Sequence, residues 1–115
     1  MKVIIAGGRE FSDYELLKRK CNSLLRNIKE VTIISGTARG ADQLGEQYAA
    51  DMGHSLMRFP AKWDLYGKAA GYKRNEEMAD NADILIAFWD GKSKGTEHMI
   101  NIAKQKGLQF RVVNY

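Results

Sequence analysis

Three short segments of the sequence combine glycine with charged or hydroxyl side chains, a composition suited to binding an anion. They are Gly7-Gly8-Arg9, Gly36-Thr37-Ala38-Arg39-Gly40-Ala41-Asp42 and Asp90-Gly91-Lys92-Ser93-Lys94-Gly95-Thr96. Glycine lets the backbone approach a ligand closely, and the N–H groups at the start of a helix attract negative charge. Because a hydrogen bond to a charged oxygen contributes about 1.5–3 kcal/mol, a few such groups and one arginine suffice for a phosphate monoester. A glycine after a strand also serves tight turns, so the prediction depends on the three segments lying together.

A fourth segment, residues 61–80, mixes aromatic and basic side chains and is expected to be an irregular connection that leads into a helix. Trp63 and Tyr66 lie among lysines, an arrangement suited to a nucleobase that stacks beside a phosphate site. A single aromatic residue of this kind more often packs over the core. Asn75, next to Arg74, falls on the apolar stripe of the predicted helix, where a polar side chain needs a partner. The segment is therefore predicted to cover the ligand.

Three acidic residues of these regions are candidates for acid or base chemistry: Asp42, Asp90 and Glu97. Acidic residues near helix N-termini commonly cap the helix or interact with its dipole. We favour the capping role for Asp42. Asp90 fits either a capping role or a catalytic one. If the protein is an enzyme, Asp90 and Glu97 are the candidate catalytic residues.

Several common sites are not supported by the sequence. No G-x-G-x-x-G follows the first predicted strand, and the Gly91-Lys92-Ser93 sequence has Ile86 where a Walker loop needs its first glycine. These patterns argue against a dinucleotide dehydrogenase and a P-loop ATPase. His54 and His98 occur in unrelated contexts, so no metal site and no cofactor are predicted. The single cysteine, Cys21, excludes an internal disulfide and fits a reducing, cytoplasmic location.

Five apolar segments are predicted to form the strands that position these loops. Residues 3–8, 31–36 and 83–91 are short apolar runs that end in glycine or an acid. Such runs are typical of central strands in a parallel sheet with helices on both faces. Residues 54–60 and 108–115 include more polar side chains, which favours edge strands.

Four helical patterns alternate with these strands, with apolar stripes within residues 17–28, 41–52, 75–82 and 96–103. Ser12 and Glu15 are expected to form a capping box before the first helix, and Gly53 and Gly107 are expected to end the second and fourth. The order β-α-β-α-β-α-β-α-β with right-handed crossovers predicts an α/β fold, a Rossmann-like three-layer αβα sandwich. Its five-stranded parallel sheet has the order 3-2-1-4-5, and ligands bind such sheets at the carboxyl ends of the strands where the winding reverses.

The length of 115 residues predicts a single domain, residues 1–115, with one core. The net charge of +4 and the pI of about 9.2 are compatible with nucleic-acid binding but do not require it. The apolar run at the N-terminus is too short for a signal peptide, and no run of about eighteen apolar residues occurs, so no membrane partner is expected. An edge strand and the stripe of the first helix both offer surfaces for a homo-oligomer, which the sequence leaves open.

The motifs "AGGREF", "SGTARGAD", "KW", "GYKRNEEM" and "FWDGKSKGTEHMI" occur in this order along nearly the whole chain. In this order they resemble the YspA-like branch of the SLOG superfamily, named for the Smf/DprA and Lonely-Guy proteins. The resemblance implies a Rossmann-like domain that binds a nucleotide or a nucleotide-derived ligand. It implies ligand contacts at Gly8, Arg9, Gly36, Arg39, Gly40, Asp42, Arg74, Asn75, Ser93, Gly95 and Thr96. The residues themselves add Thr37, Trp63 and Asp90 to this set.

One departure from a related motif bears on catalysis. The Lonely-Guy enzymes, which resemble this chain, cleave the N-glycosidic bond of nucleoside monophosphates with the glutamate of a P-G-G-x-G-T-x-x-E motif. Aligning their G-T with Gly95-Thr96 places Met99 at the position of that glutamate. Methionine cannot move a proton. Glu97, two residues earlier, projects about 200° away around the helix.

Three functions stay open, and the first is favoured. The protein binds or senses a nucleotide or nucleotide-derived phosphorylated ligand; it is a nucleoside 5'-monophosphate N-glycosidase that uses Asp90 or Glu97; or it is a single-stranded nucleic-acid-binding module that resembles DprA. The third function would use the basic residues predicted at the same edge, interspersed with acidic ones. These are Arg9, Arg39, Lys62, Lys68, Lys73, Arg74, Lys92 and Lys94.

Overall fold

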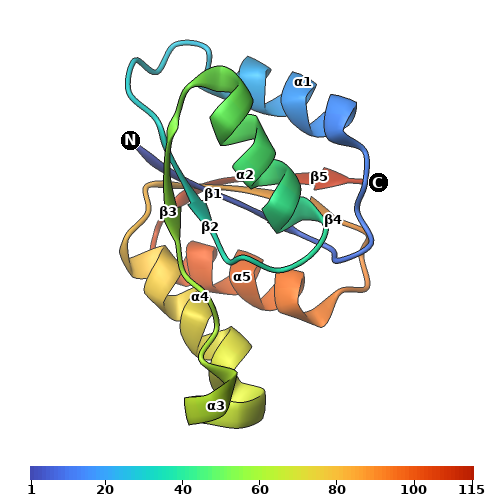
Figure 1. Ribbon diagram of the computed structural model, residues 1–115, viewed down its shortest axis with the longest axis vertical. Helices are drawn as coiled ribbons and strands as arrows, with labels where there is room; N and C mark the ends of the chain where they lie inside the picture. The colour runs from blue at the N-terminus through green and yellow to red at the C-terminus, as the bar shows by residue number, and fades with distance from the viewer.

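In the computed structural model, which describes residues 1–115, five strands alternate with helices. The elements are β1 (Lys2–Gly7), α1 (Tyr14–Leu25), β2 (Thr32–Ser35), α2 (Ala41–Met52), β3 (Ser55–Arg58), α3 (Trp63–Tyr66), a 3-10 turn (Gly67–Ala69), α4 (Ala70–Asp80), β4 (Ile84–Trp89), α5 (Lys94–Gln105) and β5 (Gln109–Asn114). Neighbouring strands all pair in parallel, in the order β3-β2-β1-β4-β5 (Figure 1). The predicted topology is confirmed.

Helices cover both faces of the sheet, because side chains of each central strand alternate between two apolar clusters. Val3 and Ile5 pack with α1 and α2 on one face, whereas Ile4 and Ala6 pack with α4 and α5 on the other. Figure 1 shows the same separation, with α1 and α2 above the sheet and α4 and α5 below it. The predicted three-layer αβα sandwich is therefore confirmed.

The strands at the centre and at the margins differ in burial as the sequence predicts. β1 and β4 each contain four consecutive buried residues, whereas β3 and β5 contain none. Ala6 of β1 pairs with Ala87 of β4 at the centre of the sheet. The loops that follow these two strands therefore leave the sheet side by side, where the direction of winding reverses.

Helix α1 begins one residue later than the predicted capping box requires. The N-cap is Asp13, whose Oδ1 accepts a hydrogen bond from the Leu16 N–H (3.0 Å). The prediction of Ser12 as the cap is wrong, because Asp13 is an equally good cap and the helix begins directly after it, at Tyr14. Glu15 lies in the first turn, where it interacts favourably with the helix dipole. The helix ends at Leu25, so Ile28 packs against the core from the turn that follows.

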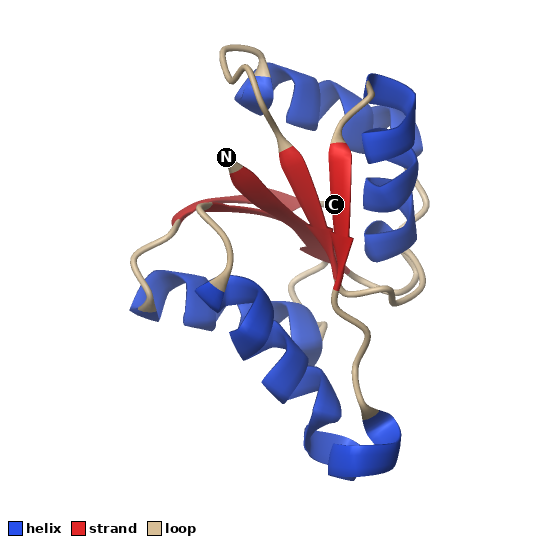
Figure 2. Cartoon of the chain, turned by 60° about the vertical axis from the view of Figure 1, so that its left-hand side comes forward, coloured by secondary structure: helices blue, strands red, loops and turns tan.

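Residues 61–80 are more helical than predicted. Instead of an irregular connection, the chain forms α3, a 3-10 turn and α4, which begins at Ala70 rather than near Asn75. No residue of α3 or of the 3-10 turn is buried, and α3 projects beyond the end of β3, away from the sheet (Figure 2). The sequence pattern did not predict these helices because periodic burial, the signal that reveals a helix, is absent from a segment outside the core.

The predicted glycine ends of two helices are confirmed. Gly53 closes α2 with φ of 72°, and Gly107 follows the last turn of α5 with φ of 74°. Both adopt the left-handed conformation that favours glycine at this position. None of the helices combines the length and the apolar character that crossing a bilayer requires.

Candidate functional site

The loops after β1, β2 and β4 meet at the carboxyl edge of the sheet, and two glycines lie where they meet. The Gly8 N–H donates to the Phe88 carbonyl oxygen (3.2 Å), and the Ala41 N–H donates to the Gly8 carbonyl oxygen (3.2 Å). A Cβ at Gly40, whose φ is 76°, would collide with the Gly8 carbonyl oxygen, and a Cβ at Gly8 would collide with the Tyr115 hydroxyl. Gly40 thus allows the loops after β1 and β2 to touch, Gly8 makes room for Tyr115, and neither lines the cavities described next.

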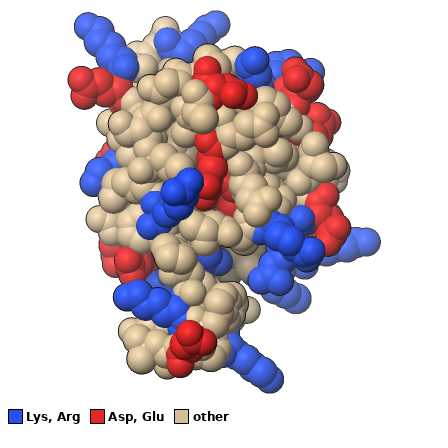
Figure 3. All heavy atoms as spheres, viewed as in Figure 1, with Lys and Arg blue, Asp and Glu red and all other residues tan.

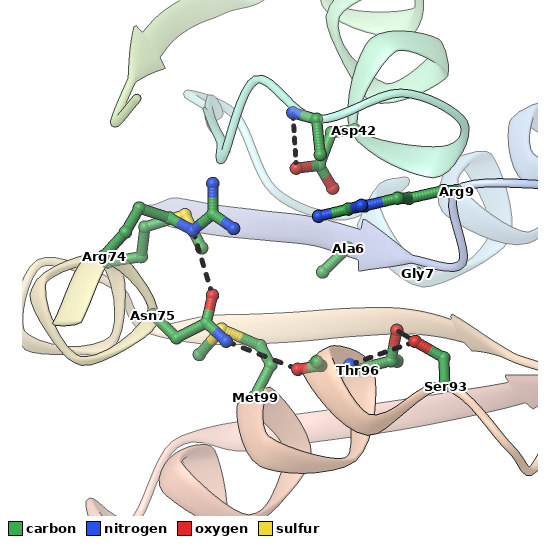
Figure 4. A pocket seen from close by; sticks show the side chains of 12 residues that line it. Ala6, Gly7, Arg9, Asp42, Arg74, Asn75, Ser93, Thr96 and Met99 are labelled. Carbon is green, nitrogen blue, oxygen red and sulfur yellow. Dashed lines mark hydrogen bonds between the residues drawn. The ribbon is translucent and has the colours of Figure 1, made fainter. Parts of the chain in front are cut away.

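Three adjoining cavities open at this edge, and Arg9 and Arg74 line all of them. The inner cavity, of about 90 Å³, has polar walls and an apolar floor formed by Asp42, Asn75, Ser93, Thr96, Met78 and Met99. The outer cavity, of about 380 Å³, is lined also by Gly36, Thr37, Arg39 and Trp63. The side cavity, of about 200 Å³, is lined also by Trp63, Lys68, Tyr72 and Gly95. Figure 4 shows Arg9 and Arg74 pointing toward each other across the inner cavity.

Arg74 extends from α4 into the centre of this edge and is held by neutral groups. Its Nη1 donates to the Gly36 carbonyl oxygen, and its Nε donates to Asn75 Oδ1 (3.1 Å). The ion pairs of the protein involve neither Arg74 nor Arg9. Burial lowers the pKa of Arg74, and Asp42 partly offsets this effect. The guanidinium is therefore a half-buried cation that makes no direct ion pair, although Asp42 lies near enough to affect its pKa.

Asn75, the polar residue on the apolar stripe of α4, uses its side chain to hold Arg74 in place. Besides accepting from Arg74, it donates through Nδ2 to the Gly95 carbonyl oxygen (3.3 Å) and lies 3.1 Å from His98 Nδ1. The side chain is 6% exposed. Asn75 thereby ties α4 to the first turn of α5, and burial lowers the pKa of the neighbouring His98.

Asp42 lies in the first turn of α2 and faces the inner cavity. The N-cap of α2 is Gly40 and no side chain caps this helix, so the predicted capping role of Asp42 is wrong. Its Oδ2 instead accepts from the Ala38 N–H (3.1 Å) within the preceding loop. The residue is only 6% exposed. Burial raises its pKa to about 6, although the Ala38 N–H and Arg74 act in the opposite direction.

The loop between β2 and α2 is held in a strained conformation by a buried hydroxyl. Thr37 has φ of 65°, which is uncommon for a residue other than glycine. Its N–H donates to Ser35 Oγ (3.0 Å), and this hydroxyl donates to Glu46 Oε2 (2.7 Å). Arg39, which follows in the loop, is exposed and lies 3.9 Å from Glu10. Thr37 and Arg39 both line the outer cavity.

The loop after β4 is shaped by Asp90, which faces its own backbone and lines none of the three cavities. Asp90 Oδ1 accepts from the N–H groups of Lys92 (2.8 Å) and Ser93 (2.9 Å), and these bonds lower its pKa. Ser93 is the N-cap of α5, with Oγ 3.4 Å from the Thr96 N and 3.0 Å from Thr96 Oγ1. Glu97 is exposed and lines none of the cavities either. Asp42 is the one carboxylate that does.

Gly95 has no packing reason to be glycine. A Cβ at this position would meet no atom within 4 Å, although glycine destabilises a helix by roughly 0.5–1 kcal/mol relative to alanine. The residue lies in the first turn of α5 and lines both the inner and the side cavity. The fold therefore does not require glycine at this position, and the missing Cβ leaves open space beside the two cavities.

Most of the predicted site residues are brought together, and some are not. The three cavities are lined by Arg9, Gly36, Thr37, Arg39, Asp42, Trp63, Arg74, Asn75, Ser93, Gly95 and Thr96, and not by Gly8, Gly40, Asp90 or Glu97. Sequence reasoning did not place Met78 and Met99 at the floor of the inner cavity. Their apolar periodicity indicated burial only, and nothing in that pattern distinguishes a core residue from a cavity floor.

Comparison with known proteins identifies the family. The model of the YspA, cpYpsA-related SLOG family matches residues 1–66. The Gene 61 protein of Mycobacterium phage D29 is 31% identical, over 99% of this chain and 95% of that protein. The chain therefore belongs to the YspA, cpYpsA-related SLOG family, which confirms the predicted resemblance.

Two solved structures share the fold at low sequence identity. DNA processing protein A (DprA) from Streptococcus pneumoniae has a TM-score of 0.77 and 18% identity, over 96% of this chain and 49% of that one. DNA processing protein A from Helicobacter pylori, whose structure concerns its single-stranded DNA binding mode, has a TM-score of 0.71 and 18% identity, over 97% and 64%. The chain thus spans about half of the first structure and under two thirds of the second. This likeness shows the fold.

Proposed function

We propose that the protein binds a nucleotide or a nucleotide-derived phosphorylated ligand at the carboxyl edge of the sheet. The observation that carries the proposal is the guanidinium of Arg74, which lines all three cavities and makes no ion pair. Partial burial of a charge that has no ion-pair partner is unfavourable, and an anion bound by Arg74 and Arg9 reduces this cost. Arginine is suited to phosphate because its planar fork donates two parallel hydrogen bonds.

The surroundings of Arg74 support a nucleotide rather than an inorganic anion. Trp63 is 51% exposed and lines both the outer and the side cavity. An exposed indole next to a phosphate site offers a stacking surface for a nucleobase. The outer cavity, of about 380 Å³, falls in the range of about 300–1,000 Å³ that is usual for small-molecule sites. The proposal concerns binding and includes no reaction.

Isothermal titration with AMP, GMP, CMP and UMP, each beside its nucleoside, tests the proposal. At least one monophosphate is expected to bind at least about tenfold more tightly than its nucleoside, since a charged hydrogen bond contributes about 1.5–3 kcal/mol. Arg74→Ala is expected to remove this difference. Arg19→Ala, which removes an exposed arginine of α1 that lines none of these three cavities, is the matched control and is expected to bind like the wild type. Equal affinity for all four pairs, or full phosphate dependence in folded Arg74→Ala, contradicts the proposal.

Single-stranded DNA binding is a second candidate, which the shared fold with DprA and the exposed Trp63 and Tyr72 favour. Acidic and neutral side chains separate the basic ones on the face in Figure 3, where no continuous basic track is visible. A phosphate backbone is best followed by such a track. A gel shift with a single-stranded oligonucleotide that weakens steeply with salt would support this candidate. The absence of a shift at low salt would exclude it and leave the nucleotide proposal unaffected.

A further inference from the structure

The inner cavity contains an acceptor that the proposed phosphate site does not use. Asp42 is 6% exposed and only its Oδ2 accepts a hydrogen bond from the protein, from Ala38. No polar side-chain atom of the protein is both buried and without a partner, so Oδ1 reaches the cavity surface, and Figure 4 shows it pointing into the cavity. A nearly buried carboxylate oxygen that faces an open space accepts a hydrogen bond from whatever fills that space, which is water in the free protein and a donor group when a ligand is bound.

The size and lining of the inner cavity restrict what this donor belongs to. About 90 Å³ holds part of a nucleotide, because whole ligands of that size occupy several hundred Å³. A phosphate is disfavoured beside Asp42 by charge repulsion. The hydroxyls of Ser93 and Thr96 lie on the opposite wall, 3.0 Å apart, and Met78 and Met99 provide an apolar floor. A compact ring that carries hydroxyl groups on one side and C–H groups on the other matches these features, and the furanose ring of ribose is such a group.

We propose that the inner cavity is a ribose subsite, in which Asp42 Oδ1 accepts a hydrogen bond from a sugar hydroxyl of the ligand. The inference rests on the proposed function, because it takes the phosphate to lie in the outer cavity, which Arg9 and Arg74 also line. The protein accordingly selects ribonucleotides over nucleotides that lack a sugar hydroxyl.

The test compares the affinities of the tightest-binding nucleoside monophosphate, its 2'-deoxy form and its 3'-deoxy form. All three carry the same phosphate and base. The ratio of the dissociation constant of each deoxy form to that of the parent nucleotide therefore measures the contribution of one sugar hydroxyl. At least one deoxy form is expected to bind the wild type about tenfold or more weakly. In Asp42→Asn, whose amide oxygen can still accept from Ala38, the ratio is expected to fall to within about twofold. Asp80→Asn, on the far end of α4, is the control and retains the wild-type ratio.

The outcomes separate the two proposals. Equal binding of all three nucleotides by the wild type overturns the ribose subsite, and if Arg74→Ala still weakens all three, the phosphate proposal stands. An unchanged ratio in Asp42→Asn also overturns the role of Asp42. Circular dichroism verifies that the variant is folded. The wild-type ratio decides on sugar selection even where the variant is unstable.

Discussion

At the scale of single residues, the glycines with positive φ differ in how much free space surrounds them. Gly40 and Gly53 have φ of 76° and 72°, but only Gly40 lies against another backbone, that of Gly8 and Arg9. Gly53→Ala is expected to cost about 1–2 kcal/mol, the penalty of a left-handed alanine. Gly40→Ala is expected to cost clearly more, because the loops after β1 and β2 must also separate. Urea denaturation of both variants measures the difference, and equal losses would show that the loops are not in close contact.

Asp42 is expected to make stability depend on pH in mildly acidic solution. Its folded pKa of about 6 lies above the ordinary value for aspartate, so the folded state binds more protons than the unfolded state between about pH 4 and 6. Stability therefore falls as pH rises through this window, by on the order of 3 kcal/mol from this residue alone. The difference in unfolding free energy between wild type and Asp42→Asn, measured from pH 4 to 7, is expected to follow this curve. A constant difference would contradict it.

At the scale of elements, α3 is expected to be the least protected helix. It consists of four residues, none of them buried, whereas α5 buries Thr96, Met99, Ile100 and Ala103. Local opening costs little where few apolar contacts are lost. Amide hydrogen exchange over residues 63–69 is expected to be fast in the free protein, while residues 99–103 exchange slowly. Slow exchange at α3 without ligand would show that contacts outside the core stabilise it.

The central strands and the α3 segment show what a sequence pattern predicts. Apolar runs predicted β1 and β4 because burial on both faces leaves no polar position in a strand. The strand order followed because the polar residues of β3 and β5 exclude them from the centre. α3 was not predicted because its residues contact little, so its helical state depends on local conformation that leaves no periodic signal.

At the scale of the whole molecule, Cys21 is expected to report on global unfolding. The thiol is 0% exposed and packs within the cluster that joins α1 and α2 to β1, β2 and β4. Burial raises its pKa to about 12, so both access and reactivity require that this core opens. Labelling with a thiol reagent across a guanidinium gradient is expected to share its midpoint with circular dichroism. Rapid labelling of the fully folded protein would show that α1 detaches separately.

The sequence predicted most of the residues that line the candidate site, but not the role of each one. Arg39 and Arg74 lie far apart in the sequence and line one cavity, because the loop after β2 and the first half of α4 meet at the carboxyl edge of the sheet. The roles of individual glycines and acids were harder to assign. A missing Cβ serves backbone contact at Gly40 and leaves open space at Gly95, and the two look identical in sequence. Asp42 follows a glycine-containing loop and Asp90 follows an apolar strand. Asp42 faces the inner cavity, whereas Asp90 faces the backbone of its own loop.

The contacts of Arg74 with Gly36 and Asn75 have a consequence for how quickly an anion is recognised. A free arginine on a surface samples many rotamers and loses that freedom when it grips a ligand. In this protein the guanidinium of Arg74 is already held by the Gly36 carbonyl oxygen and by the side-chain amide of Asn75. Most of the entropic penalty is thus incurred during folding, and association should proceed without a slow rearrangement step.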